Sequence, residues 1–220
     1  MALTCHAATP CEAAHRIEVQ VHKTAGATLE LRYTLEGDID GLLIPAQTAP
    51  RPADKLWQHT CFEAFVAGSD ERAHTLPAEP ALRVERALAE DGFRNGFSAG
   101  RVGYYELNFS PSTEWAIYRF SAYREGMTAV EPARPPHICV RREADRLALE
   151  AVVDWEPPSG VRGSPGLRLA LSAVIEDTQH RLSYWALAHP SGKPDFHHAD
   201  GFALVLPGDG GGNLHTGRTR

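Results

Sequence analysis

The chain has 220 residues, a formal net charge of −6 at pH 7, and 43% hydrophobic and 23% charged residues, which is typical of soluble globular proteins. The negative charge and the scattered arginines argue against nucleic-acid binding, which usually needs clustered basic side chains. No apolar run approaches the roughly 20 residues that a membrane span requires. These properties predict one large domain with short appendages and no nucleic-acid or membrane partner.

The first 14 residues are expected to be a frayed N-terminal arm. They lack the basic start and apolar centre of a secretory signal, so a cytoplasmic location is expected and the four cysteines should be reduced. Cys5 and Cys11, together with His6 and His15, match no zinc-binding spacing.

Residues 15–206 contain about ten short runs of alternating or apolar residues, separated by turn-forming residues at fairly even intervals. No helices recur between these runs to carry parallel crossovers. The pattern therefore predicts an all-β fold, an antiparallel β-sandwich of the immunoglobulin or jelly-roll kind. The expected strands lie at 17–23, 28–35, 42–45, 60–66, 104–110, 115–123, 137–142, 146–154, 167–175, 182–188 and 201–206.

Two segments depart from the strand pattern. Residues 70–102 read as an insertion in a hairpin, and their section 80–91 has the composition and spacing of a helix. The glycine-rich segment 207–220 is predicted to be a disordered tail. The expected domain is thus a single sandwich over 15–206 with one inserted helix.

Two of the expected strands carry polar residues between apolar ones. Alternation places Cys61, Glu63 and Phe65 on one face of the first strand, and the second strand contains Glu106 and Asn108. A shared recessed site would explain both. Its carboxylates could support glycoside hydrolysis, or could hold sugar hydroxyls between aromatic rings. The alternative is a strand with one solvated face.

The loop that precedes the last expected strand contains three further polar candidates. Asp195, His197 and His198 could bind a metal, but no helix or knuckle spacing fixes their geometry, so a shaped surface loop beside the groove is favoured. Haem is a further alternative, because a Met/His pair can hold haem iron. Besides Met1, the only methionine is Met127, in a predicted turn.

Five motifs together resemble a group of bacterial DOMON-like proteins over about residues 15–206. Their wider superfamily includes haem- and sugar-binding DOMON domains and family-9 carbohydrate-binding modules, all of them β-sandwiches. The motifs are LWQHTCFE at 56–63, YYELNFSPS at 104–112, WAIYRF at 115–120, YWALAHP at 184–190 and KPDFHH at 193–198.

The resemblance implies a ligand pocket on one concave sheet face, lined by aromatic and carboxylate groups. Glu63 matches the glutamate that helps to hold hydroxyls in sugar-binding relatives, and Trp57 and Trp185 match aromatic residues that sandwich the sugar. Haem-binding relatives use an axial methionine, and the matching strands of this chain contain none. Most of these relatives are exported, whereas this chain begins without a signal peptide.

The function expected from the sequence is non-catalytic binding of a carbohydrate or another polyhydroxylated small molecule, without a metal or cofactor. The alternatives are a haem-binding, cytochrome-like domain, a hydrolase that uses Glu63 and Glu106, and a protein-interaction sandwich. No protein partner is indicated. The expected ligand-binding residues are Trp57, His59, Glu63, Glu106, Asn108, Arg119, Trp185 and His197.

Overall fold

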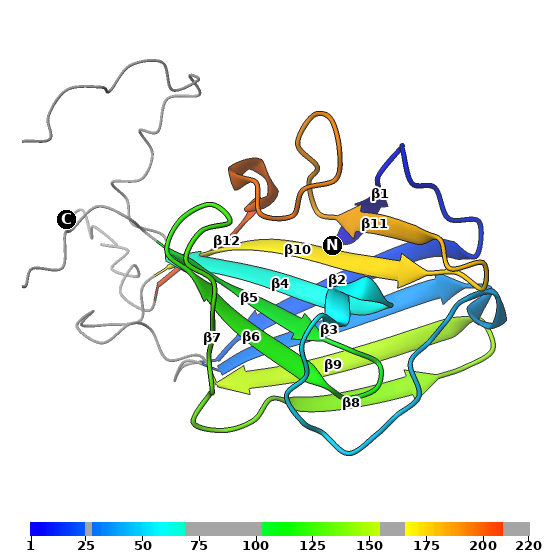
Figure 1. Ribbon diagram of the computed structural model, residues 1–220, viewed down its shortest axis with the longest axis horizontal. Helices are drawn as coiled ribbons and strands as arrows, with labels where there is room; N and C mark the ends of the chain where they lie inside the picture. Colours follow the sequence, from blue (N-terminus) through cyan, green and yellow to red (C-terminus); the bar gives the residue numbers. More distant parts are fainter. Residues whose placement is uncertain (25–27, 69–102, 155–165, 209–220) are drawn as a thin grey trace, which may run out of the picture.

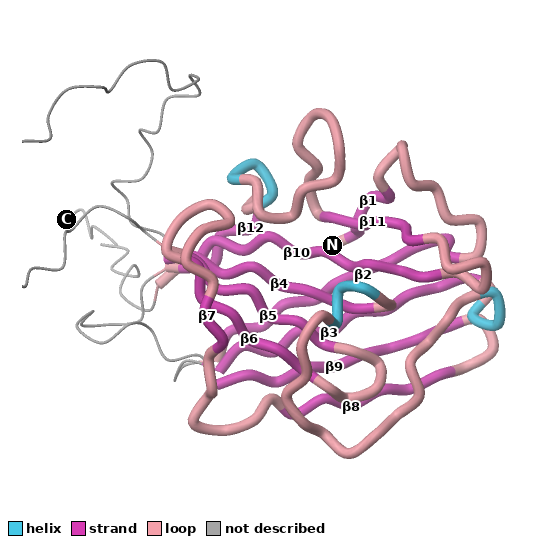
Figure 2. The backbone as a smooth tube through the Cα atoms, viewed as in Figure 1, coloured by secondary structure: helices cyan, strands magenta, loops and turns pink. Residues whose placement is uncertain are grey.

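The computed structural model describes residues 1–24, 28–68, 103–154 and 166–208. Its strands form one continuous antiparallel sheet of 12 strands, which curls so that its two halves pack face to face as two layers (Figure 1). The helical segments within the described residues are short 3-10 turns, η1 (Ile39–Gly41), η2 (Leu56–Gln58) and η4 (Ala199–Gly201), shown in cyan in Figure 2. The predicted antiparallel β-sandwich is confirmed.

The two layers have simple neighbour relations. The first layer has the order β2-β3-β9-β8, and the second has the order β11-β10-β4-β5-β6-β7, with the short β12 also paired to β10. The first layer comprises β2 (Ala14–Lys23), β3 (Thr28–Gly37), β8 (His137–Arg142) and β9 (Arg146–Asp154). The second comprises β4 (Cys61–Gly68), β5 (Tyr104–Phe109), β6 (Trp115–Phe120), β7 (Thr128–Ala129), β10 (Leu167–Glu176), β11 (Leu182–Ala186) and β12 (Leu204–Leu206).

The N-terminal residues join the two layers, so the expectation of a frayed arm is wrong. Strand β1 (Ala2–Cys5) pairs with β2 on one side and with β11 on the other. The Val19 amide donates to the Met1 carbonyl at 2.8 Å, and Leu3 is buried in the core. Four residues are too short a run for alternation to be detected. The segment is ordered because it pairs with the open edges of β2 and β11.

The core between the layers is built from one face of each strand. Alternation sends Phe62, Ala64 and Val66 of β4 into this core, where they meet side chains of the first layer. The buried Tyr33 hydroxyl of β3 donates to the Glu63 carbonyl at 2.7 Å, which ties the layers together below the Glu63 side chain. The other face of β4 is consequently the outer surface of the second layer.

Some expected element bounds differ from the structure. Residues 42–45 form no strand, only an isolated bridge between Leu42 and Asp177, because the segment leaves the sheet at Pro45. The whole of the insertion 70–102 lies outside the described residues, and so does the tail beyond Gly208. Within the described part of the chain, no helix has the length and apolarity of a membrane span.

Candidate ligand-binding pocket

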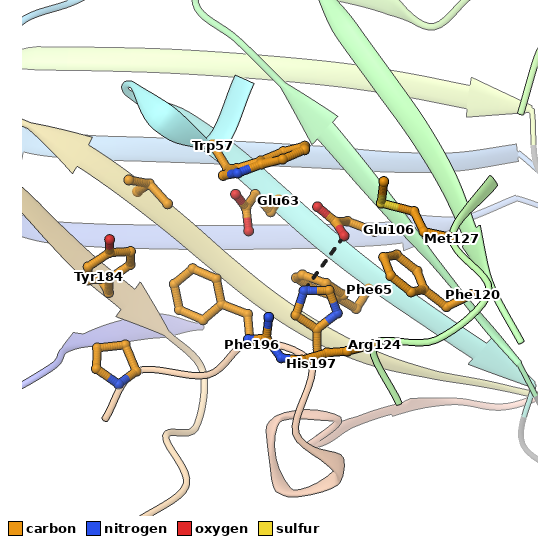
Figure 3. Close-up of a pocket in the computed structure, with 12 residues that line it drawn as sticks. Trp57, Glu63, Phe65, Glu106, Phe120, Arg124, Met127, Tyr184, Phe196 and His197 are labelled. Carbon is orange, nitrogen blue, oxygen red and sulfur yellow. Dashed lines mark ion pairs between the residues drawn. The ribbon is translucent and has the colours of Figure 1, made fainter. Parts of the chain in front are cut away.

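A cavity of about 450 Å³ lies on the outer face of the second layer (Figure 3). Its lining comes from β4, β5, β6, β10 and β11 of the sheet, and from η2, the segment 121–127 after β6 and the segment 187–203 before β12. Five aromatic rings, two carboxyl groups, one guanidinium and one imidazole face it. The lining residues are Trp57, Glu63, Phe65, Glu106, Phe120, Arg124, Met127, Val174, Tyr184, Pro194, Phe196 and His197.

Strand register brings the two glutamates onto one face. Glu63 lies opposite Asn108 on β5, and Phe65 lies opposite Glu106. Directly opposed residues share a face, so Glu63 and Glu106 are diagonal neighbours there. On its other side Glu63 lies opposite Ser172 of β10. The sheet therefore presents two carboxyl groups to the same pocket.

The Glu63 side chain is only 2% exposed, and its carboxyl is half satisfied. Ser172 Oγ donates to Oε2 at 3.3 Å, whereas Oε1 has no hydrogen-bond partner among the described residues. Burial, with a contribution from the charge of Glu106, raises the pKa of Glu63 well above its usual value. An unpartnered buried carboxyl oxygen is costly, so its presence at a pocket wall indicates a ligand contact.

Glu106 is held more firmly. The Asn108 amide donates to its Oε1 at 2.9 Å, and Asn108 itself is fully buried. Burial raises the pKa of Glu106, although the Asn108 hydrogen bond and the charge of Arg124 act in the opposite direction. Its second oxygen, Oε2, lies 3.8 Å from Nε2 of His197, a contact drawn as a dashed line in Figure 3.

The two ring nitrogens of His197 contact Tyr104 and Glu106. Nδ1 lies 2.8 Å from the Tyr104 hydroxyl, whose oxygen also accepts from the Arg124 amide at 3.1 Å. We assign the ring proton to Nε2, which faces Glu106, so that the Tyr104 hydroxyl donates to Nδ1. Burial lowers the pKa of His197 to about 4, with a further contribution from the charge of Arg124. His197 is therefore a neutral hydrogen-bond donor at neutral pH.

We expect the His197 imidazole to stay neutral until the pH falls to about 4. Unfolded histidine takes up its proton near pH 6.5, so this group lowers stability as the pH falls from about 6.5 to about 4. Tyr104→Phe removes the donor that favours the neutral ring, and should raise the His197 pKa. NMR titration of the histidine signals measures the His197 pKa in the wild type and in Tyr104→Phe. Tyr105→Phe, on the opposite face of β5, should leave the value unchanged, and a wild-type His197 titrating near 6.5 would contradict the assignment.

A second network fastens the two loop walls together. Arg124 Nη2 donates to Asp195 Oδ1 at 2.8 Å, the Tyr123 hydroxyl donates to Oδ2, and the His197 amide donates to Oδ1 at 3.1 Å. Asp195 is thus engaged by Arg124 and Tyr123. His198 lies elsewhere, because its Nδ1 accepts from the Asp200 amide in η4.

The donor atoms of Asp195, His197 and His198 do not assemble into a metal site. Asp195, His197 and His198 make separate contacts, and the described residues contain no group of three metal-binding side chains. Their proximity in sequence does not bring their donor atoms together, because a loop without regular spacing orients successive side chains differently.

Five of the eight expected ligand-binding residues lie in the pocket or support it. Trp57, Glu63, Glu106 and His197 line it, and Asn108 holds Glu106 from the same face. Trp57 reaches the pocket from η2, with its ring edge-to-face on Tyr118 at 5.7 Å between centroids.

The other three expected residues lie elsewhere. Trp185 is buried between the layers, where its Nε1 donates to Ser183 Oγ at 3.1 Å, because alternation on β11 turns it inward. Arg119 is exposed and shares the strand face of Trp115 and Ile117, opposite the pocket. His59 has a side chain that is 64% exposed and is bonded to Glu176.

Several lining residues were not among the expected ones. Two of them carried a usable signal: Phe120 alternates with Arg119, and Tyr184 alternates with Trp185, so each takes the face opposite its neighbour. Arg124, Met127 and Phe196 come from irregular segments, where the sequence gives no direction to a side chain. The lining residues outside the expected ligand-binding set are Phe65, which alternation had placed on the Glu63 face, and Phe120, Arg124, Met127, Val174, Tyr184, Pro194 and Phe196.

Comparison with known proteins identifies the fold. No protein-family model matches the chain, and no curated protein sequence is significantly similar to it. A Bacteroides uniformis protein proposed to bind carbohydrate superposes with a TM-score of 0.54 at 12% identity, covering 87% of this chain and 77% of its own. A family-9 carbohydrate-binding module from Caldicellulosiruptor kristjanssonii, solved with glucose, matches with a TM-score of 0.36 at 9% identity, covering 80% and 68%. The similarity to the Bacteroides protein shows that the two chains share this β-sandwich fold.

Proposed function

We propose that the protein binds a carbohydrate or another polyhydroxylated small molecule in the pocket above Glu63, without catalysis. The observation that carries the proposal is the unpartnered Oε1 of Glu63 at the base of an aromatic-walled cavity. Carboxylates accept hydrogen bonds from hydroxyl groups, and amides both accept hydrogen bonds from them and donate to them. Aromatic rings cover the apolar C–H faces of sugars. The shared fold with a protein proposed to bind carbohydrate supports this, as does the resemblance to DOMON-like proteins.

The pocket also has the dimensions for such a ligand. Its volume of about 450 Å³ lies within the range of roughly 300–1,000 Å³ that small-molecule sites occupy. Polar groups are few, at Glu63, Glu106, Arg124 and His197, while Trp57, Tyr184 and Phe196 supply apolar surface. A site of this kind binds through a small number of oriented hydrogen bonds and a large apolar contact.

Hydrolysis is the second candidate, because Glu63 and Glu106 face one pocket on adjacent strands. Glycosidases need one carboxyl protonated and the other ionised. Here burial raises the pKa of both, and no cationic side chain is bonded to either among the described residues. The rise is larger for Glu63, because the Asn108 hydrogen bond and the charge of Arg124 counteract it at Glu106. Glu63 would therefore be the acid and Glu106 the base of such a reaction.

Haem does not fit the donor set of the pocket. Met127 and His197 both line it, which is the one observation in favour of haem. However, His197 Nδ1 accepts from Tyr104, Nε2 faces Glu106, and two carboxyl groups occupy the space beside them. A buried carboxyl pair is an unfavourable lining for an apolar macrocycle. We therefore propose that the protein functions without haem.

A thermal-shift screen against mono- and oligosaccharides and polyols tests the proposal. A ligand at about 100 times its Kd should stabilise the wild type by about 2.7 kcal/mol, which raises Tm by roughly 5–10 °C. Trp57→Ala and Glu63→Gln should each weaken that binding at least tenfold. Arg119→Ala is the matched control, since Arg119 lies outside the pocket.

Two outcomes would contradict the proposal. Shifts of wild-type size in both pocket variants would place the ligand elsewhere. Release of nitrophenol from nitrophenyl glycosides, lost in Glu63→Gln and Glu106→Gln, would instead establish the hydrolase.

A further inference from the structure

The two carboxyl groups at the pocket floor lack a bonded cation. Within the described residues, the Glu63 carboxyl receives a hydrogen bond only from the Ser172 hydroxyl, and the Glu106 carboxyl receives one from the Asn108 side-chain amide. His197 faces Glu106 as a neutral ring. Arg124 lines the pocket, but its guanidinium donates to Asp195 and its charge acts on Glu106 without a hydrogen bond. The positive charge that two buried carboxylates need is therefore incomplete.

This arrangement is costly for the free protein. Two ionised carboxylates on neighbouring positions of one buried face repel each other and lose their hydration. Burial raises the pKa of both groups, which favours their protonated forms in the free protein. A ligand that brought one positive charge between them would supply the missing counter-charge and favour their ionised forms, with release of a proton.

The aromatic walls of the pocket are also suited to a positively charged ligand. Trp57, Phe65 and Phe196 line the pocket around the carboxyl groups, and Figure 3 shows Glu63 and Glu106 pointing into the space between Trp57 and the His197 ring. The faces of aromatic rings attract cations, and Trp does so most strongly. Their attraction adds to that of the carboxylates. An ammonium group offers three donors, and Glu63 Oε1 and Glu106 Oε2 each accept one.

A metal ion is a less suitable cation. The described residues hold no cluster of three metal ligands. Two carboxyl groups with aromatic neighbours supply too few oxygens for a hard divalent cation, which takes six or more. The chemistry of the pocket favours an organic cation.

Resting on the proposed function, we propose that the polyhydroxylated ligand carries a protonated amino group, as an amino sugar does, and that this ammonium binds between the Glu63 and Glu106 carboxylates. The hydroxyl-bearing remainder would contact the aromatic walls. Acylation of the amine removes its charge, so an N-acyl derivative should lose the added affinity of the amine.

Matched sugar pairs test the inference by isothermal titration calorimetry. Glucosamine, galactosamine and mannosamine are compared with glucose, galactose and mannose, and with their N-acetyl derivatives. For at least one pair the amine should bind about tenfold or more tightly than both neutral forms, and Glu63→Gln should remove most of that difference. Titrations in two buffers of different ionisation enthalpy should show proton release for the amine alone.

The outcomes separate the two proposals. Neutral sugars that bind as tightly as their amines would overturn the inference and leave carbohydrate binding intact. An amine preference that survives in Glu63→Gln and Glu106→Gln would also overturn it, because the charge would then be recognised elsewhere. Binding by no member of any pair counts against the inference and the proposed function together.

Discussion

Glu63→Gln is expected to stabilise the protein by about 1–3 kcal/mol at neutral pH, since it removes a buried carboxyl that lacks a full set of partners. For a chain of this size that corresponds to an increase in Tm of roughly 2–12 °C. Most substitutions of buried residues destabilise, so this sign is diagnostic. Glutamine has nearly the same shape, and its amide oxygen can still accept from Ser172.

The pH dependence follows from the direction of the pKa shift. The Glu63 pKa is raised in the folded state, whereas in the unfolded chain it is about 4.3. Below about pH 4 both states hold the proton, and the carboxyl contributes no penalty. As the pH rises toward the folded pKa, the unfolded state loses its proton first, so stability is lost. The advantage of Glu63→Gln should therefore grow with pH.

Urea denaturation between pH 4 and pH 9 measures this difference. The exposed Glu131 provides a matched control, and Glu131→Gln should change stability by less than about 0.5 kcal/mol at every pH. A Glu63→Gln variant that is less stable than the wild type at neutral pH would show that the carboxyl is satisfied. It would remove the main physical reason for a ligand at this position.

A stabilising substitution at the proposed binding residue has a functional meaning. Binding sites retain groups that lower stability when those groups contact a ligand. Glu63 fits that description, since among the described residues only Ser172 forms a hydrogen bond with its carboxyl group. The combination of increased stability and lost binding in one variant would separate a ligand-contacting carboxyl from a structural one.

The sequence was sufficient to predict the features that depend on strand alternation. Phe62 and Glu63 take opposite faces of β4, and Glu106 shares the Glu63 face, because antiparallel register and a period of two decide both. The same rule separates Tyr184 from Trp185 without saying which of them points inward. The choice of Trp185 as a pocket residue was wrong because β11 directs its larger ring into the core.

Features that depend on contacts between residues distant in sequence could not be predicted from alternation. Arg124 meets Asp195 from a turn 71 residues earlier in the chain, and Tyr104 meets His197 from a strand 93 residues earlier. Arg124, Asp195 and His197 lie in irregular segments, which have no periodic pattern that fixes side-chain direction. The pairing of β1 with β2 and β11 is likewise decided by the open strand edges of the assembled sheet.

Phe65→Ala is expected to cost about 3–5 kcal/mol of stability and to disrupt the pocket. Phe65 is 1% exposed and packs against the loop wall, with its ring edge-to-face on His197 at 5.0 Å and on Phe202 at 6.5 Å between centroids. Loss of the ring removes the surface on which the segment 187–203 rests. The released His197 should regain water, so its pKa should rise from about 4 toward 6.5.

Two variants of the same strand separate local from general destabilisation. Phe62→Ala removes an equally buried ring from the opposite face and should cost a similar free energy of unfolding, but should leave the His197 pKa near 4. Phe65→Leu keeps most of the apolar volume and should cost less than Phe65→Ala. Urea denaturation and histidine NMR titration measure the two effects independently. If Phe62→Ala and Phe65→Ala shifted His197 equally, the pocket wall would depend on the stability of the whole sandwich, and Phe65 would have no specific part in positioning His197 above Glu106.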